Sequence, residues 1–243
     1  MSKPKFLVVI VIICYVLFAV NEFSGSETLA LHLRSLLVPF ITIGYTFYIT
    51  SKNNLFWAFL ICYSLSDLLT IVMGNMTFSS AVIANDFEYF AGNALYILAY
   101  IFLIVKIVRL INFGYVFKYL KIHSLVLLFL NIYLFSVLNG FIKSNLVYQI
   151  DYYFELIYNV IILTLFFVGM INFFCRDNRK SLFIFLGSVS IVFSEIMDVA
   201  YIYIDNRQFL SFLSTTLMLL SFNLFYYQAS MTNVNTKINN FIY

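Results

Sequence analysis

Charged residues are scarce in this chain: Asp, Glu, Lys and Arg make up 10% of its 243 residues, against about 25% in a soluble domain. Hydrophobic residues make up 63% of the sequence, and the mean hydropathy is +0.96. A chain with so little polar surface would precipitate from water, which excludes a soluble enzyme. We therefore expect one integral membrane domain over residues 1–243. Its partner is the membrane, and we expect no binding of nucleic acid.

Residues that commonly hold metals or cofactors are also few. The two histidines, His32 and His123, are far apart, and the three cysteines, Cys14, Cys62 and Cys175, lie in or beside apolar runs. The sequence has no G-x-S-x-G elbow, no P-loop and no G-x-G-x-x-G. We expect no metal site and no cofactor, and serine-hydrolase, nucleotide and flavin chemistry lack support.

Apolar segments dominate what is present. There are eight, each near the ~20 residues that a spanning helix needs, at about 6–20, 33–50, 55–74, 91–108, 123–142, 153–174, 181–204 and 210–228. The predicted fold is an all-α membrane bundle of eight transmembrane helices. The first segment, between Lys3 and Lys5 on one side and SGS on the other, also resembles a signal peptide, and this alternative stays open.

The connections between these segments are short. The predicted loops at 51–54, 175–180 and 205–208 are only a few residues long, so consecutive helices should pack as antiparallel neighbours. The sequence shows no clear internal repeat, and the polar stretch at 230–243 is expected to fray.

Basic residues follow the alternation of these spans. With the N-terminus in the cytoplasm, eleven of the 14 Lys and Arg residues fall on cytoplasmic stretches, and only Arg34, Lys143 and Arg207 fall outside. This positive-inside bias predicts that both termini are cytoplasmic. The abundance of Phe, Tyr, Ile and Asn suggests a low-GC genome, so we expect a multi-pass protein of a bacterial inner membrane.

Three carboxylates lie inside apolar spans: Asp67 in the third, and Glu195 and Asp198 in the seventh. A charged side chain at bilayer depth costs roughly 2.5–3.5 kcal/mol on insertion scales, so such residues usually face the bundle interior and mark functional sites. The predicted orientation puts all three in the outer half of the membrane. Arg34 and Glu155 lie near the outer starts of their spans.

Helical spacing places other polar residues on the same helix faces as these acids. Tyr63, Ser64, Asp67 and Thr70 form one stripe on the third span, because residues three or four apart share a face. Glu195 and Asp198 are three apart on the seventh, with Ser188, Ser194 and Tyr201 on the same side. Two facing helices would bring carboxylates together, one protonated and one ionised, as an acid–base pair.

Structural explanations stand beside this functional one. Asp67 could pair with Arg34 or bond a hydroxyl, and Asp198 could lie near the lipid headgroups. Glu155 could be interfacial, and Arg34 could reach the headgroups by snorkelling. Polar residues in the fifth and eighth spans are more often contacts between helices than ligands.

The order of short motifs resembles the YhhN or lysoplasmalogenase-like family of eight-span membrane proteins. RSLLVP has Arg34 where the family has Lys, and YSLSDLL matches the family's span-three acid at Asp67. GNALYILAY has Tyr100 where the family has His, GSVSIVFSEIMD has Glu195 in place of Asp, and Gln228 matches a Gln in the last span.

The resemblance implies hydrolysis of the vinyl-ether bond of lysoplasmalogen, with a membrane lysophospholipid as the substrate. Protonation of the vinyl ether forms an oxocarbenium ion, which a neutral carboxyl and an ionised one could together promote. We expect Asp67 and Glu195 to be catalytic, and Arg34 to bind the substrate phosphate. Tyr63, Tyr100 and Asp198 are the remaining candidate substrate contacts, and the oligomeric state stays open.

Two other functions are compatible with the sequence. Intramembrane acids also mark ion pathways, so a proton- or cation-coupled transporter is one alternative. Repeats and Gly/Pro-broken helices favour a transporter, and the only prolines here are Pro4 and Pro39. A non-catalytic membrane protein of the same fold is the other alternative, because the residues at positions 100 and 195 depart from the family pattern.

Overall fold

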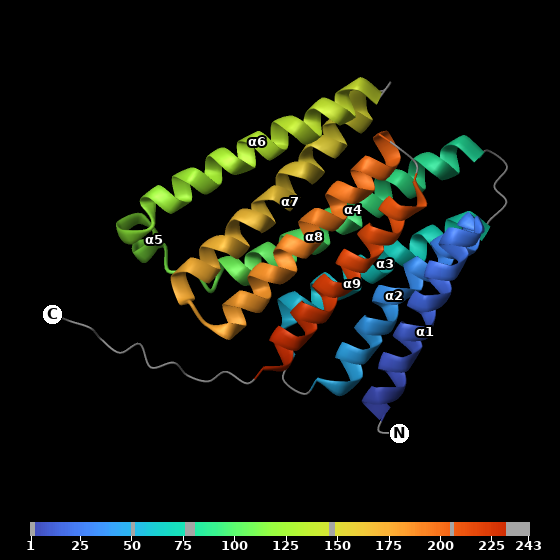
Figure 1. Ribbon diagram of the computed structural model, residues 1–243, viewed down its shortest axis with the longest axis horizontal. Coiled ribbons are helices and arrows are strands. Elements are labelled where there is room, and N and C mark those ends of the chain that lie inside the picture. The colour runs from blue at the N-terminus through green and yellow to red at the C-terminus, as the bar shows by residue number, and fades with distance from the viewer. Residues whose placement is uncertain (1–2, 50–51, 76–80, 146–148, 205–206, 232–243) are drawn as a thin grey trace.

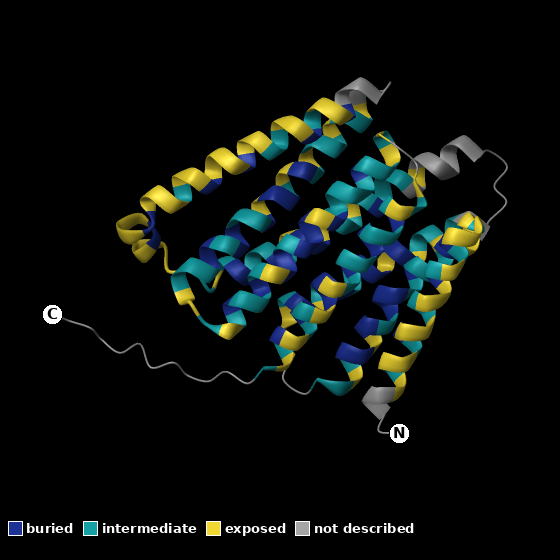
Figure 2. Cartoon of the chain, in the orientation of Figure 1, coloured by how far each residue is buried: buried dark blue, intermediate teal, exposed yellow. Residues whose placement is uncertain are grey.

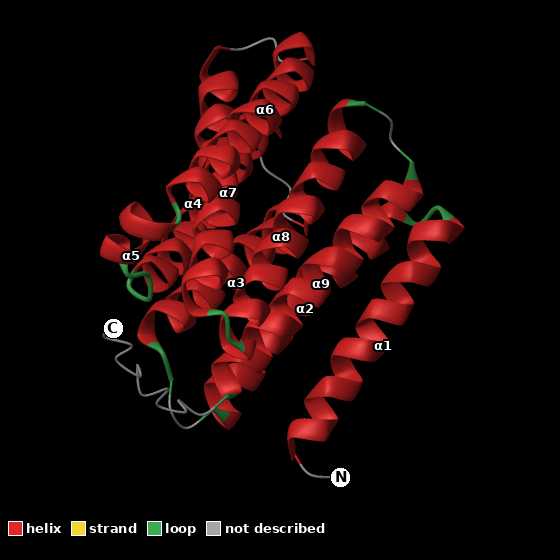
Figure 3. Ribbon diagram, turned by 60° about the vertical axis from the view of Figure 1, so that its left-hand side comes forward, coloured by secondary structure: helices red, strands yellow, loops and turns green. Residues whose placement is uncertain are grey.

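The computed structural model describes residues 3–49, 52–75, 81–145, 149–204 and 207–231, and these residues are helical apart from short turns (Figure 3). The helices are α1 (Lys3–Ser24), α2 (Glu27–Tyr48), α3 (Asn54–Asn75), α4 (Ala81–Val108), α5 (Phe113–Tyr119), α6 (Lys121–Asn145), α7 (Gln149–Arg176), α8 (Arg179–Tyr203) and α9 (Gln208–Ser230). All of them except α5 are long and apolar enough to cross a membrane. The chain is therefore a multi-pass integral membrane protein, as its eight apolar segments predict.

The helix boundaries differ from the sequence prediction at several points. The predicted loop at 175–180 is wrong, because α7 continues to Arg176 and α8 begins at Arg179. Asp177 adopts a left-handed φ of 38°, which Asp tolerates better than most residues. Asn178 then caps α8 in a capping box with Ser181. Two residues thus suffice for the turn, and the basic residues after it belong to a helix.

Two further differences concern α2 and α5. The second span begins at Glu27, so Arg34 lies two turns inside α2 and not at its start. The short helix α5 was not predicted, because seven residues give too weak a periodic signal. The predicted loops at 51–54 and 205–208 fall partly outside the described residues, and the predicted tail at 230–243 falls almost entirely outside them.

Six helices form a closed ring. Contacts run from α2 to α3, α4, α7, α8, α9 and back to α2. Consecutive spans are neighbours, as predicted, with one exception: over their described residues α4 and α6 make no contact, because α5 separates them and α4 packs on α7. The ring encloses the space in which buried polar groups can meet.

The remaining two spans pack outside this ring. α1 lies against α2 and α9, and α6 lies against α7 and α8, at opposite edges of the molecule (Figure 1). Both helices are largely exposed along their length (Figure 2), with apolar side chains such as Val20 and Phe129 on the surface. In a bilayer this surface faces lipid, which is as apolar as the side chains themselves.

The helix order repeats. α1 packs outside α2, which is followed round the ring by α3 and α4; α6 packs outside α7, which is followed by α8 and α9. Because connections alternate between the two ends, α1–α4 and α6–α9 also run in the same directions. No repeat is visible in the sequence, but the arrangement of the helices contains one. In this repeat α3 and α8 occupy equivalent positions in the two units. These are the two helices that carry the intramembrane acids.

An aromatic layer fills the middle of the ring. Phe56 and Phe59 of α3 meet Phe222 and Phe225 of α9, and the rings of Phe59 and Phe222 stack with centroids 5.3 Å apart. All four side chains are fully buried. Gly187 of α8 makes room for Phe225, because a Cβ at this position would lie 2.6 Å from the Phe225 ring.

Candidate functional site: a carboxylate cluster inside the ring

Arg34 and Asp198 form an ion pair between α2 and α8. Arg34 Nη2 lies 2.6 Å from Asp198 Oδ2, and their side chains are 23% and 21% exposed. Ser214 of α9 accepts a longer hydrogen bond, 3.4 Å, from the same nitrogen. The acid that partners Arg34 is thus Asp198 and not Asp67. Neither Arg34 nor Asp198 depends on lipid headgroups for a partner.

Asp67 lies deeper, on α3, and is 6% exposed. Tyr96 of α4 donates a hydrogen bond of 2.5 Å to Asp67 Oδ1. The other oxygen, Oδ2, is buried and has no hydrogen-bond partner among the described residues. A buried carboxylate oxygen without a partner is costly to keep charged. One oxygen of Asp67 is therefore free to hold a proton or to meet a ligand.

Glu195 of α8 is bonded by tyrosines from two other helices. Tyr100 of α4 donates a hydrogen bond of 2.5 Å to Glu195 Oε1, and Tyr158 of α7 donates another. Donated hydrogen bonds stabilise the ionised form of a carboxyl group. Glu195 therefore has more donors than Asp67 to stabilise a negative charge.

Tyr63 of α3 connects the two acids. Its ring centroid lies 4.6 Å from that of Tyr96 and 6.1 Å from that of Tyr100, the partners of Asp67 and Glu195. Asp67 and Glu195 interact electrostatically, and each also interacts with Arg34. We call this set the carboxylate cluster; it comprises Arg34, Tyr63, Asp67, Tyr96, Tyr100, Tyr158, Glu195 and Asp198. Its members come from five helices of the ring, with Ser214 of α9 beside them.

Other predicted polar residues hold helices together. Ser64, from the predicted stripe on the third span, bonds Thr42 of α2 at 2.6 Å. Ser194 donates to the backbone carbonyl of Ser214 in α9. Small hydroxyl residues of this kind let membrane helices approach closely and bond across their interface. These residues position α3 and α8 and do not take part in the cluster.

Glu155 lies apart from the cluster. It accepts a hydrogen bond of 2.9 Å from Tyr89 of α4. It is thus a third intramembrane carboxyl bonded by a tyrosine, but with neither Asp67 nor Glu195 among its contacts.

Sequence reasoning missed Tyr96, Tyr158 and Ser214. Tyr96 is four residues before Tyr100 and so shares its helix face, which is a signal that the sequence does contain. Tyr158 and Ser214 have no such signal, because tyrosines number 19 in the chain and hydroxyl residues are frequent throughout the last span.

The arrangement suits proton transfer. A buried carboxyl with one unpartnered oxygen, a second carboxyl bonded by two tyrosines, and an arginine nearby are the components of acid–base chemistry in a site of low dielectric constant. Across the part of the chain that the structure describes, no three His, Cys, Asp or Glu residues gather as metal ligands. No family model matches the sequence, and comparisons with curated proteins and with solved structures also found no match.

Proposed function

We propose that this protein is a membrane-embedded hydrolase that cleaves the vinyl-ether bond of lysoplasmalogen or a related ether lysolipid. One observation supports this most: Asp67 has an unpartnered buried oxygen and lies within electrostatic reach of Glu195, which accepts hydrogen bonds from two tyrosines. This is the two-carboxyl arrangement that stabilises oxocarbenium-like states in glycosidases. The resemblance in span order and motifs points to the same chemistry.

In this proposal Asp67 is the general acid and Glu195 the carboxylate. The reason is the difference in their hydrogen bonds. Glu195 accepts bonds from Tyr100 and Tyr158, which favour its negative charge. Asp67 accepts one bond, from Tyr96, and its other oxygen can carry the proton that it donates.

The reaction then proceeds in three steps. Asp67 transfers its proton to the β-carbon of the vinyl ether, which forms a C–H bond and leaves an oxocarbenium ion opposite Glu195. Water adds to the cationic carbon and gives up a proton to a carboxylate, which forms a hemiacetal. The hemiacetal breaks its C–O bond to the glycerol moiety and yields an aldehyde and the glycerophospho head group. The proton is returned overall, so water is the only reactant consumed.

Arg34 is proposed to bind the substrate phosphate. Both of its hydrogen bonds among the described residues come from Nη2, so Nε and Nη1 remain to contact a phosphate oxygen. Asp198 holds the guanidinium in place, and the rings of Tyr63 and Tyr100 pack against each other with centroids 6.1 Å apart. Arg34 and Asp198 are partly exposed, so we expect the substrate to reach the cluster from their side.

We also propose that both termini lie in the cytoplasm of a bacterial cell and that the cluster lies in the outer half of its inner membrane. The positive-inside bias carries this orientation. Reporter fusions at each end of the chain test it: activity of a periplasmic reporter at either terminus would contradict it.

Aldehyde release from lysoplasmalogen by the purified protein tests the catalytic proposal. We expect Asp67→Asn and Glu195→Gln each to lower the rate by at least about 100-fold, because general acid–base catalysis contributes roughly 10²–10⁴. Glu155→Gln is the matched control, since it removes another tyrosine-bonded intramembrane carboxyl and should keep the activity. Full activity in both cluster variants would refute the mechanism.

A proton- or cation-coupled transporter is the second candidate, and the repeated helix order favours it. Parallel repeats of helix order occur in transporter folds, and here two units run in the same direction with acids on equivalent helices. The aromatic layer would then be the barrier that has to open. Substrate-driven proton flux in liposomes, lost in Asp67→Asn, together with no release of aldehyde, would establish this alternative. Absence of both activities would favour a non-catalytic role.

A further inference from the structure

A second polar region lies at the end of the bundle where α4, α7 and α9 end and α8 begins. A pocket of about 450 Å³ opens there, a size typical of small-molecule sites. Five basic side chains line it, namely Lys52, Lys106, Arg109, Arg176 and Lys180. None of its lining residues in the described part of the chain is Asp or Glu, and Asp177, which is nearby in sequence, is exposed. We call this the basic pocket.

Lys106 lies at the floor of the basic pocket, only 6% exposed. Its Nζ donates a hydrogen bond of 2.8 Å to Gln228 Oε1 and lies 4.3 Å from the centre of the Phe56 ring. Neither partner carries a negative charge. Among the described residues no Asp or Glu pairs with Lys106, so its buried amine has no acidic partner.

Asn172 of α7 is the second unusual group in the basic pocket. Its side chain is completely buried, and neither its amide nitrogen nor its oxygen has a hydrogen-bond partner among the described residues. Buried amides are nearly always satisfied, because an unmade bond there is costly. An anionic ligand that accepts from the nitrogen would remove part of this cost, and it would also give Lys106 a partner of opposite charge.

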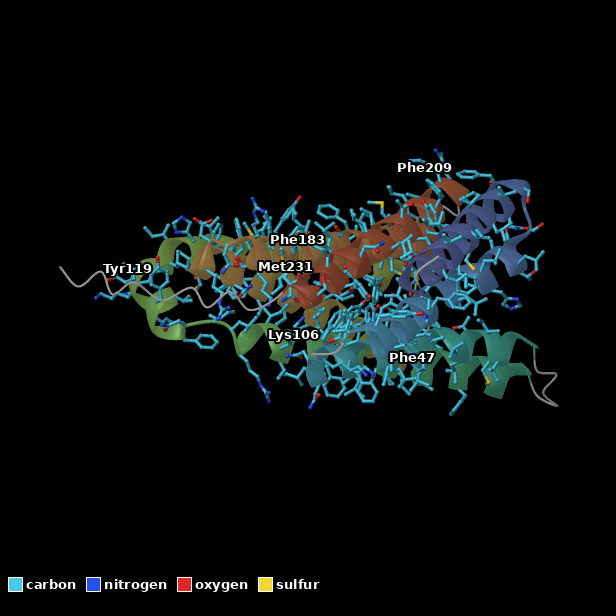
Figure 4. The ribbon with its side chains drawn as sticks, turned by 90° about the horizontal axis from the view of Figure 1, so that it is seen from below. Phe47, Lys106, Tyr119, Phe183, Phe209 and Met231 are labelled. Carbon is cyan, nitrogen blue, oxygen red and sulfur yellow. The ribbon has the colours of Figure 1, made fainter. Side chains whose placement is uncertain are left out.

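Two cations at the rim are held toward the pocket by backbone carbonyls. Arg176 Nε donates to the carbonyl of Leu110 at 3.0 Å, and Lys180 Nζ donates to that of Met231 at 3.0 Å. Figure 4 labels Lys106 and Met231, which line the pocket from α4 and from the residue after α9. Lys180 lies in the first turn of α8, where the helix dipole is already positive.

Membrane topology by itself does not account for this arrangement. The positive-inside bias calls for basic residues near loops, and exposed Lys118 and Lys121 satisfy it from the surface. A lysine that serves only to orient the protein in the membrane is more stable when its amine reaches water, whereas Lys106 is buried. A buried lysine without an acidic partner, in the same pocket as an unsatisfied amide, is an environment that a bound anion would stabilise.

We propose that the basic pocket binds a phosphate group, either of a soluble phosphorylated compound or of an anionic lipid headgroup. Lys106 and Asn172 contact the phosphate oxygens at the floor, and Arg176 and Lys180 close over it at the rim. This site is independent of the proposed hydrolase, because the aromatic layer separates it from the carboxylate cluster.

Titration of the full-length protein in detergent with inorganic phosphate tests this, with thermal unfolding and calorimetry as the measurements and chloride at equal ionic strength as the reference. We expect phosphate to raise the unfolding temperature more than chloride does. Asn172→Leu, Lys106→Met and Arg176→Gln should each weaken phosphate binding about tenfold or more, as expected for losing a hydrogen bond to a charged group. Lys118→Gln removes the same charge outside the pocket and should leave binding unchanged.

The same variants separate a ligand site from a structural one. Asn172→Leu and Lys106→Met should unfold no earlier than the wild type in phosphate-free buffer, because they remove an unsatisfied amide and an uncompensated charge. Arg176→Gln alters an exposed side chain, so it keeps the test valid if either buried variant fails to fold. Equal effects of phosphate and chloride, or unchanged phosphate binding in Arg176→Gln and in whichever buried variants fold, would overturn the proposal.

Nanodiscs distinguish the two sources of phosphate. If phosphatidate in the disc abolishes the response to inorganic phosphate, the ligand is a lipid headgroup. If the response is the same in phosphatidate and phosphatidylcholine discs, the ligand is a soluble phosphate compound. Both results support the phosphate site.

Discussion

The carboxylate cluster and the basic pocket hold buried charge in different ways. In the cluster, Arg34 meets Asp198 at 2.6 Å and the two deeper acids are bonded by tyrosines. In the pocket, Lys106 meets a neutral glutamine and the face of a phenylalanine. The first region is largely compensated by the protein's own groups, whereas the second is not. This difference is the basis of the two proposals, proton chemistry for one region and binding of an anion for the other.

The two regions are separated along the helices. Lys106 and Tyr96 are ten residues apart on α4, or about 15 Å along its axis. The aromatic layer lies between them: Phe56 contacts Lys106 on one side, and Phe222 contacts Tyr63 on the other with centroids 4.8 Å apart. Without this separation the uncompensated cation would have acids within reach.

Removal of the separating layer should have the largest effect. Phe59 contacts five other aromatic rings and is fully buried. We expect Phe59→Ala to lower the free energy of unfolding by roughly 3–5 kcal/mol, because it leaves a cavity in a packed core, and to increase proton leak in liposomes. Phe129→Ala, on the exposed face of α6, is the control and should do neither. A stable, proton-tight Phe59→Ala protein would show that the layer does not separate the regions.

Loss of the internal counter-ion should have the next largest effect. Arg34→Gln leaves Asp198 without its cation. We expect a loss of roughly 2–3 kcal/mol, at or below the range for fully buried pairs because about a fifth of each side chain is exposed. The double variant Arg34→Gln/Asp198→Asn should recover most of this loss in a denaturant titration. If the single and double variants unfold at the same point, the pair does not compensate charge in the cluster.

The tyrosine partners should have the smallest effects, and they distinguish the two acids. Tyr100→Phe removes a hydrogen bond from Glu195, the proposed carboxylate, and should cost roughly 1.5–3 kcal/mol. Tyr96→Phe removes a bond from Asp67, the proposed neutral acid, and should cost about 1 kcal/mol. Thermal unfolding of the two variants in one detergent compares them directly. If Tyr96→Phe loses more stability than Tyr100→Phe, Asp67 and not Glu195 is the charged acid.

Several features of the fold follow from the sequence because they depend on local properties. A helix in lipid satisfies its own backbone groups, so length and apolar character suffice to predict a span. The third, seventh and eighth spans were predicted close to their observed ends. Short irregular elements are different: α5 and the two-residue turn at Asp177–Asn178 depend on capping and on one left-handed residue, which the hydropathy pattern does not contain.

The residues of the candidate site could be predicted from the sequence, but the side chains with which they interact could not. Asp67, Glu195 and Asp198 stand out because acids are expensive in a membrane. The sequence allowed Arg34 to pair with Asp67, but the structure pairs it with Asp198. Lys106 was assigned to the end of the bundle where it lies, yet nothing in the sequence indicated that it is buried under Gln228 and Phe56.

By itself the sequence determined the membrane environment, the eight spans, their alternation and the presence of acids within them, because each of these depends on residues close together in one helix. The tertiary structure alone decided the ring of six helices, the repeat of helix order, the pairing of charges and the aromatic layer between them. These depend on which helix faces which. In lipid that choice is made by packing and by a few interhelical hydrogen bonds, which no periodicity within a single helix records.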